Sequence, residues 1–175
     1  MRKHPHRFNG EKALQAILYV AERVNGEENM YAVLKLIYFA DKEHLQRYGR
    51  FIFGDRYVAL GHGPVPSGAY DLVKYVRGDG WDLDFERAKA SFAVEKNHLA
   101  IHQPANLEVF SDSDIACLDW AIETFGGLSF GELKKLSHDA AYEAADLNDR
   151  IPVEAIAAAT GDEALVAHLK DPAPG

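Results

Sequence analysis

Apolar residues recur along most of the chain at the three- and four-residue spacing of an α-helix. The first such stretch contains Leu14, Ile17, Leu18 and Ala21. The second runs from about Met30 to Tyr48 and is followed by Gly49, a residue type that commonly ends helices. A third helix is predicted to begin at about Ser67. The pattern therefore predicts a series of amphipathic helices, each burying its apolar stripe.

The segment between the second and third of these helices lacks the helical spacing of apolar residues. Residues 57–60 form a short run of apolar residues that we interpret as an extended piece, and Gly61-His62-Gly63-Pro64 follows it. Pro64 and Pro66 fix their φ angles and carry no N–H group, so they exclude a helix there. We expect a loop from Gly61 to Pro66.

A two-residue period of apolar positions appears once, ahead of the acidic C-terminal third of the chain. It predicts a small β-hairpin from Phe92 to Ile101 with a two-residue turn at Asn97-His98. This register places Val94 opposite Ile101 and keeps the apolar side chains on one face.

The rest of the chain carries strong helix-start signals. Two capping boxes are predicted, from Ser111 with Asp114 and from Ser129 with Glu132. Two further helices are expected, one near Pro152 and one after Gly161-Asp162. Together the elements predict a mainly α fold of seven or eight helices with one small β-hairpin.

Length and composition fit one compact domain. The 175 residues are 47% hydrophobic and 26% charged, enough to bury one substantial core. We expect one domain over residues 1–175, with its core at about 10–170 and loose ends. No stretch approaches the roughly 20 apolar residues of a membrane span, and Cys117 is the single cysteine, so we expect a cytoplasmic protein without an intrachain disulfide.

The charge is divided unevenly along the chain. Residues 1–105 contain 15 Lys and Arg against 13 Asp and Glu, whereas residues 106–175 contain 4 against 14. The acidic C-terminal part disfavours nucleic-acid binding by the whole chain, because phosphate affinity depends on Lys and Arg. A DNA-binding regulator that uses the less acidic first part stays open as an alternative, although no cluster of Arg or Lys marks a recognition helix.

The second predicted helix contains candidate chemistry. Its apolar stripe places Asp41 and His44 on the buried side, spaced so that they can touch, and the Gly-His-Gly loop offers His62 as a third member. A structural polar cluster is favoured, because buried polar groups are normally hydrogen-bonded. Two alternatives remain open: a metal site, since two histidines and a carboxylate suit zinc, and general acid–base catalysis by a hydrolase. The chain has no Gly-rich phosphate loop.

Aromatic and arginine residues gather around the Gly and Pro turns, and such residues often dominate the energy of protein interfaces. We therefore predict a partner-binding surface there. Its members are Tyr48, Arg50, Phe51, Phe53, Arg56, Tyr57, Pro64 and Tyr70.

Several of these segments resemble the Panacea domain of SocA-like antitoxins. The resemblance rests on Lys35-Leu36-Ile37-Tyr38-Phe39-Ala40, continued through His44-Leu45 to Tyr48-Gly49-Arg50, and on Gly63-Pro64-Val65. Leu136-Ser137-His138-Asp139 and residues 151–156 are also similar to the closing helices of that family. The resemblance covers about residues 10–160.

Such a resemblance implies a helical domain that neutralises a small toxin by direct binding, within bacterial or phage toxin–antitoxin pairs. It implies no catalytic activity and no cofactor. A role as a proteolytic adaptor, which would involve a protease complex, is known within the family. We expect the toxin to be encoded by a neighbouring gene.

Overall fold

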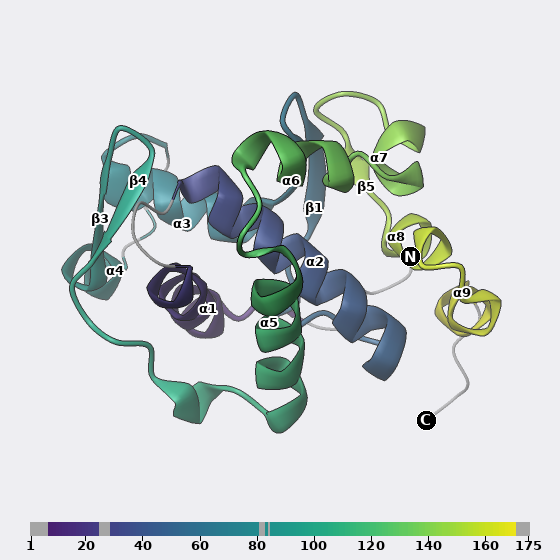
Figure 1. The fold of residues 1–175 in the computed structure, drawn as a ribbon, viewed down its shortest axis with the longest axis horizontal. Coiled ribbons are helices and arrows are strands. Elements are labelled where there is room, and N and C mark those ends of the chain that lie inside the picture. The colour runs from purple at the N-terminus through teal and green to yellow at the C-terminus, as the bar shows by residue number, and fades with distance from the viewer. Residues whose placement is uncertain (1–6, 25–28, 81–82, 84, 171–175) are drawn as a thin grey trace.

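The computed structural model describes residues 7–24, 29–80, 83 and 85–170. Of these residues, 60% are helical and 12% are in strands, which confirms the mainly α class. The helices in this part of the chain, shown in Figure 1, are α1 (Gly10–Arg23), α2 (Met30–Tyr48), α3 (Ser67–Arg77), α4 (Glu86–Ser91), α5 (Asp112–Phe125), α6 (Phe130–Ser137), α7 (Ala140–Ala144), α8 (Val153–Ala159) and α9 (Glu163–Lys170), with a 3-10 turn at Leu107–Val109.

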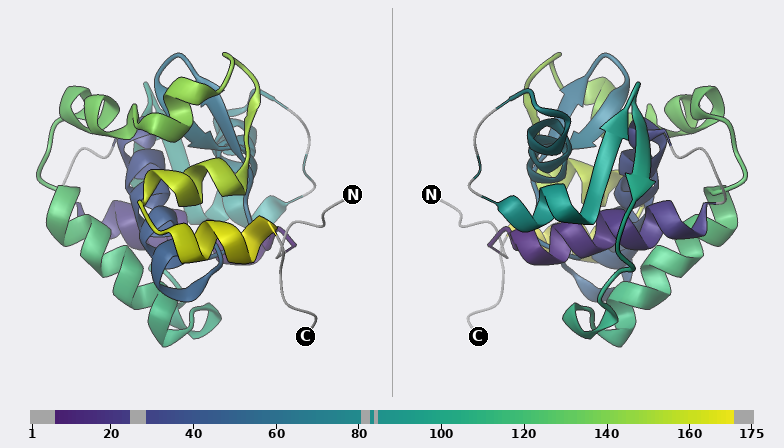
Figure 2. Two further views of the ribbon diagram at one scale, coloured as in Figure 1. Left: turned by 90° about the vertical axis from the view of Figure 1, so that its right-hand side faces the viewer. Right: turned by 90° about the vertical axis from the view of Figure 1, so that its left-hand side faces the viewer.

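Helix α2 lies at the centre of the molecule, with α1, α3, α5, α6 and α8 packed around it (Figure 1). All side chains from Val33 to Asp41 are buried, which a helix can achieve only when other elements cover every side of it. Figure 2 shows α8 and α9 on one side of the molecule and the β3–β4 hairpin beside α1 on the opposite side. The core therefore forms around the segment that carries the family resemblance.

The helix ends follow the local signals of the sequence. Helix α2 ends at Gly49, whose φ of 78° is the left-handed conformation expected of a C-terminal glycine. Both predicted capping boxes are present, at Ser111 and at Ser129. Helices α8 and α9 begin after Pro152 and Asp162, as predicted. The prediction of loose chain ends concerns residues 1–6 and 171–175, which lie outside the described residues.

Two small antiparallel sheets accompany the helices. One has the strand order β2-β1-β5, and its strands are β1 (Tyr57–Leu60), β2 (Gly63–Pro66) and β5 (Arg150–Ile151). The sequence predicted the extended piece at β1 but neither of its partners. Pro64 and Pro66 are compatible with β2 because it is an edge strand, where a missing N–H group is tolerated. The short helices α4 and α7 were also not predicted separately, and nine α-helices are described instead of seven or eight.

The second sheet is the predicted hairpin, formed by β3 (Phe92–Glu95) and β4 (His98–Ile101), but its register differs from the prediction. Val94 pairs with Leu99 rather than with Ile101. The turn residues are Lys96 and Asn97, which have φ of 49° and 68°, so Asn97 occupies the second central position and not the first. Moving the turn by one residue shifts each pairing by two, which leaves the apolar residues on a common face.

Candidate functional site

Asp41 is completely buried and holds the segment after α2 in place. Its Oδ1 accepts a hydrogen bond from the Ile52 amide at 2.7 Å, and its Oδ2 accepts one from the Tyr57 hydroxyl at 2.6 Å. Burial raises the pKa of Asp41 to about 7, because the two hydrogen bonds offset only part of the lost hydration. The carboxyl group thus ties strand β1 and the chain after α2 to the central helix.

His44 is also fully buried and belongs to a separate cluster. Its Nδ1 lies 2.8 Å from the Arg50 carbonyl oxygen, and since a carbonyl only accepts, Nδ1 carries a proton. Its Nε2 lies 2.9 Å from Ser113 Oγ and 3.3 Å from Asp114 Oδ1. Lys12 of α1 and Arg50 approach the same carboxylate at 2.5 Å and 3.2 Å. The cluster joins α1, α2 and α5.

The Asp114 carboxylate is the anionic centre of this cluster. Burial alone raises its pKa, but the close contacts with His44 and Lys12 and the hydrogen bond from the Ser111 amide outweigh burial and hold the pKa well below its usual range. Asp114 therefore stays ionised across the physiological pH range. It stabilises both the start of α5 and the partly buried cations Lys12 and Arg50.

His62 does not join Asp41 and His44, so the predicted convergence of the three residues is wrong. The His62 ring is exposed in the turn between β1 and β2, where it packs on Tyr31 and Phe130 at centroid distances of 5.1 Å and 5.9 Å. Tyr31 stands ten residues before Asp41 on α2, which corresponds to about 15 Å along the helix axis. Among the described residues, no group of three or more His, Cys, Asp or Glu side chains is arranged to hold a metal ion.

The predicted partner-binding surface divides into exposed and buried residues. Arg56 and Tyr48 are exposed and Tyr70 is half-buried. The Arg50 guanidinium is used internally, because it donates to the carbonyl oxygens of Phe51 and Ile52. The remaining members are core residues, which corrects the prediction that their side chains contact a partner: Phe51, Phe53, Tyr57 and Pro64. A side chain covered by the protein's own core is not available to a binding partner.

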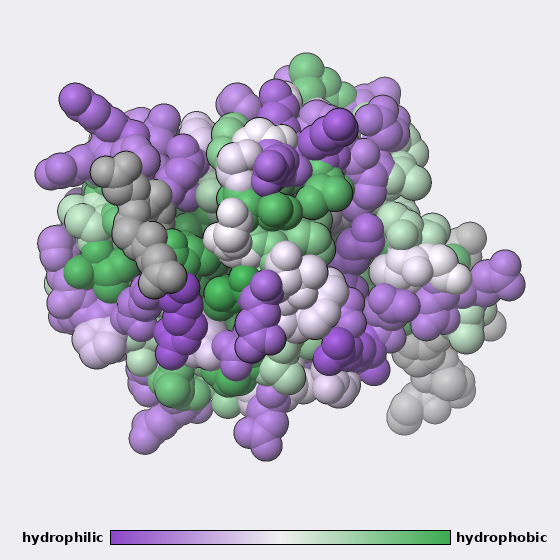
Figure 3. Space-filling model, viewed as in Figure 1, coloured by the Kyte–Doolittle hydropathy of each residue, from purple (hydrophilic) through white to green (hydrophobic). Residues whose placement is uncertain are grey.

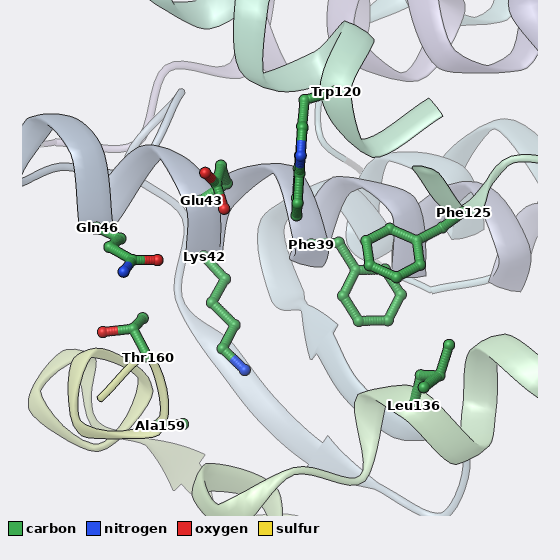
Figure 4. A pocket seen from close by; sticks show the side chains of 9 residues that line it. All are labelled: Phe39, Lys42, Glu43, Gln46, Trp120, Phe125, Leu136, Ala159 and Thr160. Atoms are coloured by element: carbon green, nitrogen blue, oxygen red, sulfur yellow. The ribbon is translucent and has the colours of Figure 1, made fainter. Parts of the chain in front are cut away.

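A groove that the sequence did not indicate lies between α2, α5, α6 and the end of α8 (Figure 4). Its volume is about 310 Å³, and its lining consists of Phe39, Lys42, Glu43, Gln46, Trp120, Phe125, Leu136, Ala159 and Thr160. Figure 3 shows hydrophobic residues near the middle of the molecular face, over α5 and α6, with hydrophilic residues around them.

Aromatic rings build the apolar end of the groove. Phe39 and Phe125 stack at a centroid distance of 4.3 Å, and Trp120 meets Phe125 edge-on at 5.5 Å. Leu136 stands beside them and leaves 51% of its surface exposed (Figure 4). Each of these residues alone matches an ordinary helix position, and only the packing of α5 and α6 against α2 brings them together.

The polar end of the groove is balanced in charge. The Lys42 ammonium lies 3.0 Å from Asp139 Oδ2, which also accepts a hydrogen bond from the Tyr38 hydroxyl. Glu43 accepts a hydrogen bond from Arg47 at 2.6 Å. Ion pairs already made within the chain leave apolar contact as the main source of binding energy at this surface.

Three segments that carry the family resemblance meet beside the groove. Lys35 of α2, Gly63 of β2 and Ser137-His138 at the end of α6 come into contact there. Asp139, the next residue, accepts hydrogen bonds from α2. Segments that are about 28 and 74 residues apart in the chain are thus joined on one face of the central helix.

The structure therefore defines a mainly helical domain with a partly apolar groove along its central helix. The family model described as "Antitoxin SocA-like, Panacea domain" matches residues 33–143, which is more than half of the chain. The chain belongs to this family, as its sequence motifs predicted. Neither the search of curated proteins nor the search of solved structures returned a match. No described helix is long and apolar enough to cross a membrane.

Proposed function

We propose that this protein is an antitoxin that neutralises a small protein toxin by forming a direct complex with it. Family membership supports the antitoxin role, and the single structural observation that carries the binding mode is the groove between α2, α5, α6 and α8. The proposed mechanism is binding and not catalysis.

The groove suits an apolar side chain or two from a protein partner. Trp is among the residues most often found at the energetic centre of interfaces, and Trp120 lies in the wall of this groove next to the Phe39–Phe125 stack. A volume of about 310 Å³ is small for a drug-sized ligand and adequate for one or two large aliphatic or aromatic side chains. The balanced charges of Lys42 and Glu43 would then form the rim of the interface.

The test is co-expression of the neighbouring small open reading frame with and without this protein. We expect the neighbour to inhibit growth alone, and to be neutralised and to co-purify when both are present. A Leu136→Glu variant, which places a charge at the groove, should lose both effects. The matched control is Leu147→Glu, since Leu147 is 64% exposed after α7 and does not line the groove.

Two outcomes would contradict parts of this proposal. A neighbour that is harmless alone, or that forms no complex, contradicts the antitoxin role. If Leu136→Glu still neutralises while Arg56→Ala does not, the interface lies at the exposed arginine that the sequence indicated and not at the groove. The lifetime of the toxin in the cell separates the two modes of action, because delivery to a protease shortens that lifetime and simple occlusion does not.

A further inference from the structure

Within the part of the chain that the structure describes, the ammonium group of Lys35 is buried without a counter-charge. Its side chain is 1% exposed, and among the residues that the structure describes no carboxylate lies within 4.0 Å of Nζ. Burial and, to a smaller extent, the positive charge of Lys134 lower the pKa of Lys35 to about 8. Buried charges are normally paired, because an unpaired charge loses its hydration without compensation. Lys35 is therefore a buried charge without an ionic partner in the described core.

Other hydrogen-bonding groups converge on the same point. A Cβ atom placed on Gly63 would lie 2.8 Å from Lys35 Nζ, 2.7 Å from Ser137 Oγ and 3.3 Å from His138 Cδ2. His138 Cδ2 is bonded to Nε2, and Nε2 is buried with no hydrogen-bond partner in the structure. The Lys35 ammonium, the Ser137 hydroxyl and the His138 ring thus lie together beside Gly63, on the side where another residue would carry its Cβ atom.

The surroundings of this cluster are positive. Burial lowers the pKa of His138, and the nearby charges of Lys35 and Lys134 lower it further. Glu143 acts on His138 in the opposite direction but more weakly than these cations. Asp139 is bonded to Tyr38 and Lys42 on the groove side, so its charge is already compensated. A buried cation beside a hydroxyl group and an unpartnered imidazole nitrogen favours an anion, and the described part of the chain does not supply one.

We propose that Lys35, Lys134, Ser137 and His138 form a binding site for one small oxyanion, a carboxylate or a phosphate group. The ammonium groups would supply the charge, and the Ser137 hydroxyl would donate a hydrogen bond. The bound anion would offset the positive surroundings that lower the pKa of His138, so that the imidazole takes up a proton from solvent and its Nε2 donates as well. The hydroxyl now donates to the Lys134 carbonyl at 2.9 Å and can rotate toward a ligand. Lys134 and His138 are only half-buried, so the ligand would enter from the side of α6.

The test measures the thermal midpoint of the purified full chain, Tm, in sodium phosphate, sodium acetate and sodium chloride at equal ionic strength and pH 7. A site occupied at about ten times its dissociation constant should raise Tm by roughly 3–6 °C over chloride. The phosphate and acetate arms show which kind of oxyanion the site prefers. Lys35→Met should abolish the increase, whereas Lys135→Met, an exposed lysine of the same helix as Lys134, should retain it.

A second measurement keeps the proposal testable if Lys35→Met does not fold. The imidazole resonances of His138 in the wild-type protein should shift on titration with phosphate or acetate and should saturate, while chloride leaves them unchanged. Equal Tm values in all three salts, together with unshifted His138 resonances, would overturn the proposal. So would an oxyanion-dependent increase of full size in Lys35→Met.

Discussion

Replacing Asp41 with Asn should remove a large part of the pH dependence of stability. Asp41 is completely buried, and burial raises its pKa from 3.8 to about 7. The amide side chain of the variant would keep an oxygen for the Ile52 amide, and its NH₂ group could donate to the Tyr57 hydroxyl oxygen. The substitution Asp41→Asn therefore removes the ionisation while it preserves the shape and both contacts.

The sign of the effect follows from proton binding. Between pH 3.8 and about 7 the folded protein holds a proton on Asp41 that the unfolded chain has released, so the free energy of unfolding falls as pH rises through this window. A pKa difference of about three corresponds to about 4 kcal/mol over the whole window, at 1.36 kcal/mol per pKa unit. The part that falls between pH 5 and pH 8 is about 2.5 kcal/mol. Asp55, whose pKa burial raises to about 6, contributes in the same direction in both proteins.

The assay is urea unfolding followed by circular dichroism at pH 5 and pH 8. From pH 5 to pH 8 the free energy of unfolding of the wild type should fall by about 2.5 kcal/mol more than that of Asp41→Asn. Asp41→Ala is the contrasting variant: it leaves the Ile52 amide and the Tyr57 hydroxyl buried without their acceptor, which costs about 2–5 kcal/mol at both pH values. Equal pH dependence in the wild type and in Asp41→Asn would refute the reasoning.

Two further predictions concern the cluster at Gly63. Gly63→Ala should lower the free energy of unfolding by about 1–3 kcal/mol, because φ is +116° and the added Cβ would meet Ser137 and Lys35 at less than 3.0 Å. Gly61→Ala is the control: its added Cβ would meet nothing within 4 Å, so the free energy of unfolding should change by less than about 0.5 kcal/mol in the same urea assay. Lys35→Met should raise the free energy of unfolding by up to about 3 kcal/mol in chloride at pH 7. The pKa of Lys35 in the folded protein, about 8, lies below the ordinary 10.5, so the charged side chain destabilises the fold and its removal relieves this cost. By the same linkage, wild-type stability at Lys35 should increase as pH rises from 8 to 10.5, and unfolding curves at pH 7 and pH 10 should show this increase in the wild type alone.

Local signals account for the features that the sequence predicted well. Helix α2 begins at Met30 and ends before Gly49, and both limits depend on residues within one turn of the helix end. The capping boxes at Ser111 and Ser129 likewise join residues three positions apart. The burial of Asp41 and His44 followed from helical periodicity alone.

Features that depend on distant segments could not be predicted in this way. Strand β5 pairs with β1 across about 90 residues, and two residues of sequence carry no signal for such a partner. The position of His62 depends on the direction in which the β1–β2 turn leaves the sheet. Phe51 and Tyr57 stand near predicted turns in the sequence, but the packing of the chain against α2 makes them core. An aromatic residue near a turn is compatible with either location.

The groove and the proposed oxyanion site share the segment from Leu136 to Asp139, and this connection determines how their tests must be interpreted. Leu136 lines the groove, Ser137 and His138 contact the Lys35 side, and Asp139 accepts hydrogen bonds from α2. A substitution at Leu136 could therefore act by displacing the whole segment. If Leu136→Glu abolishes toxin binding but retains the oxyanion-dependent increase in Tm, the segment is in place and the lost contact belongs to the groove. If both are lost together, the loss of toxin binding reflects a displaced segment, and a substitution at Trp120 on α5 has to locate the interface instead.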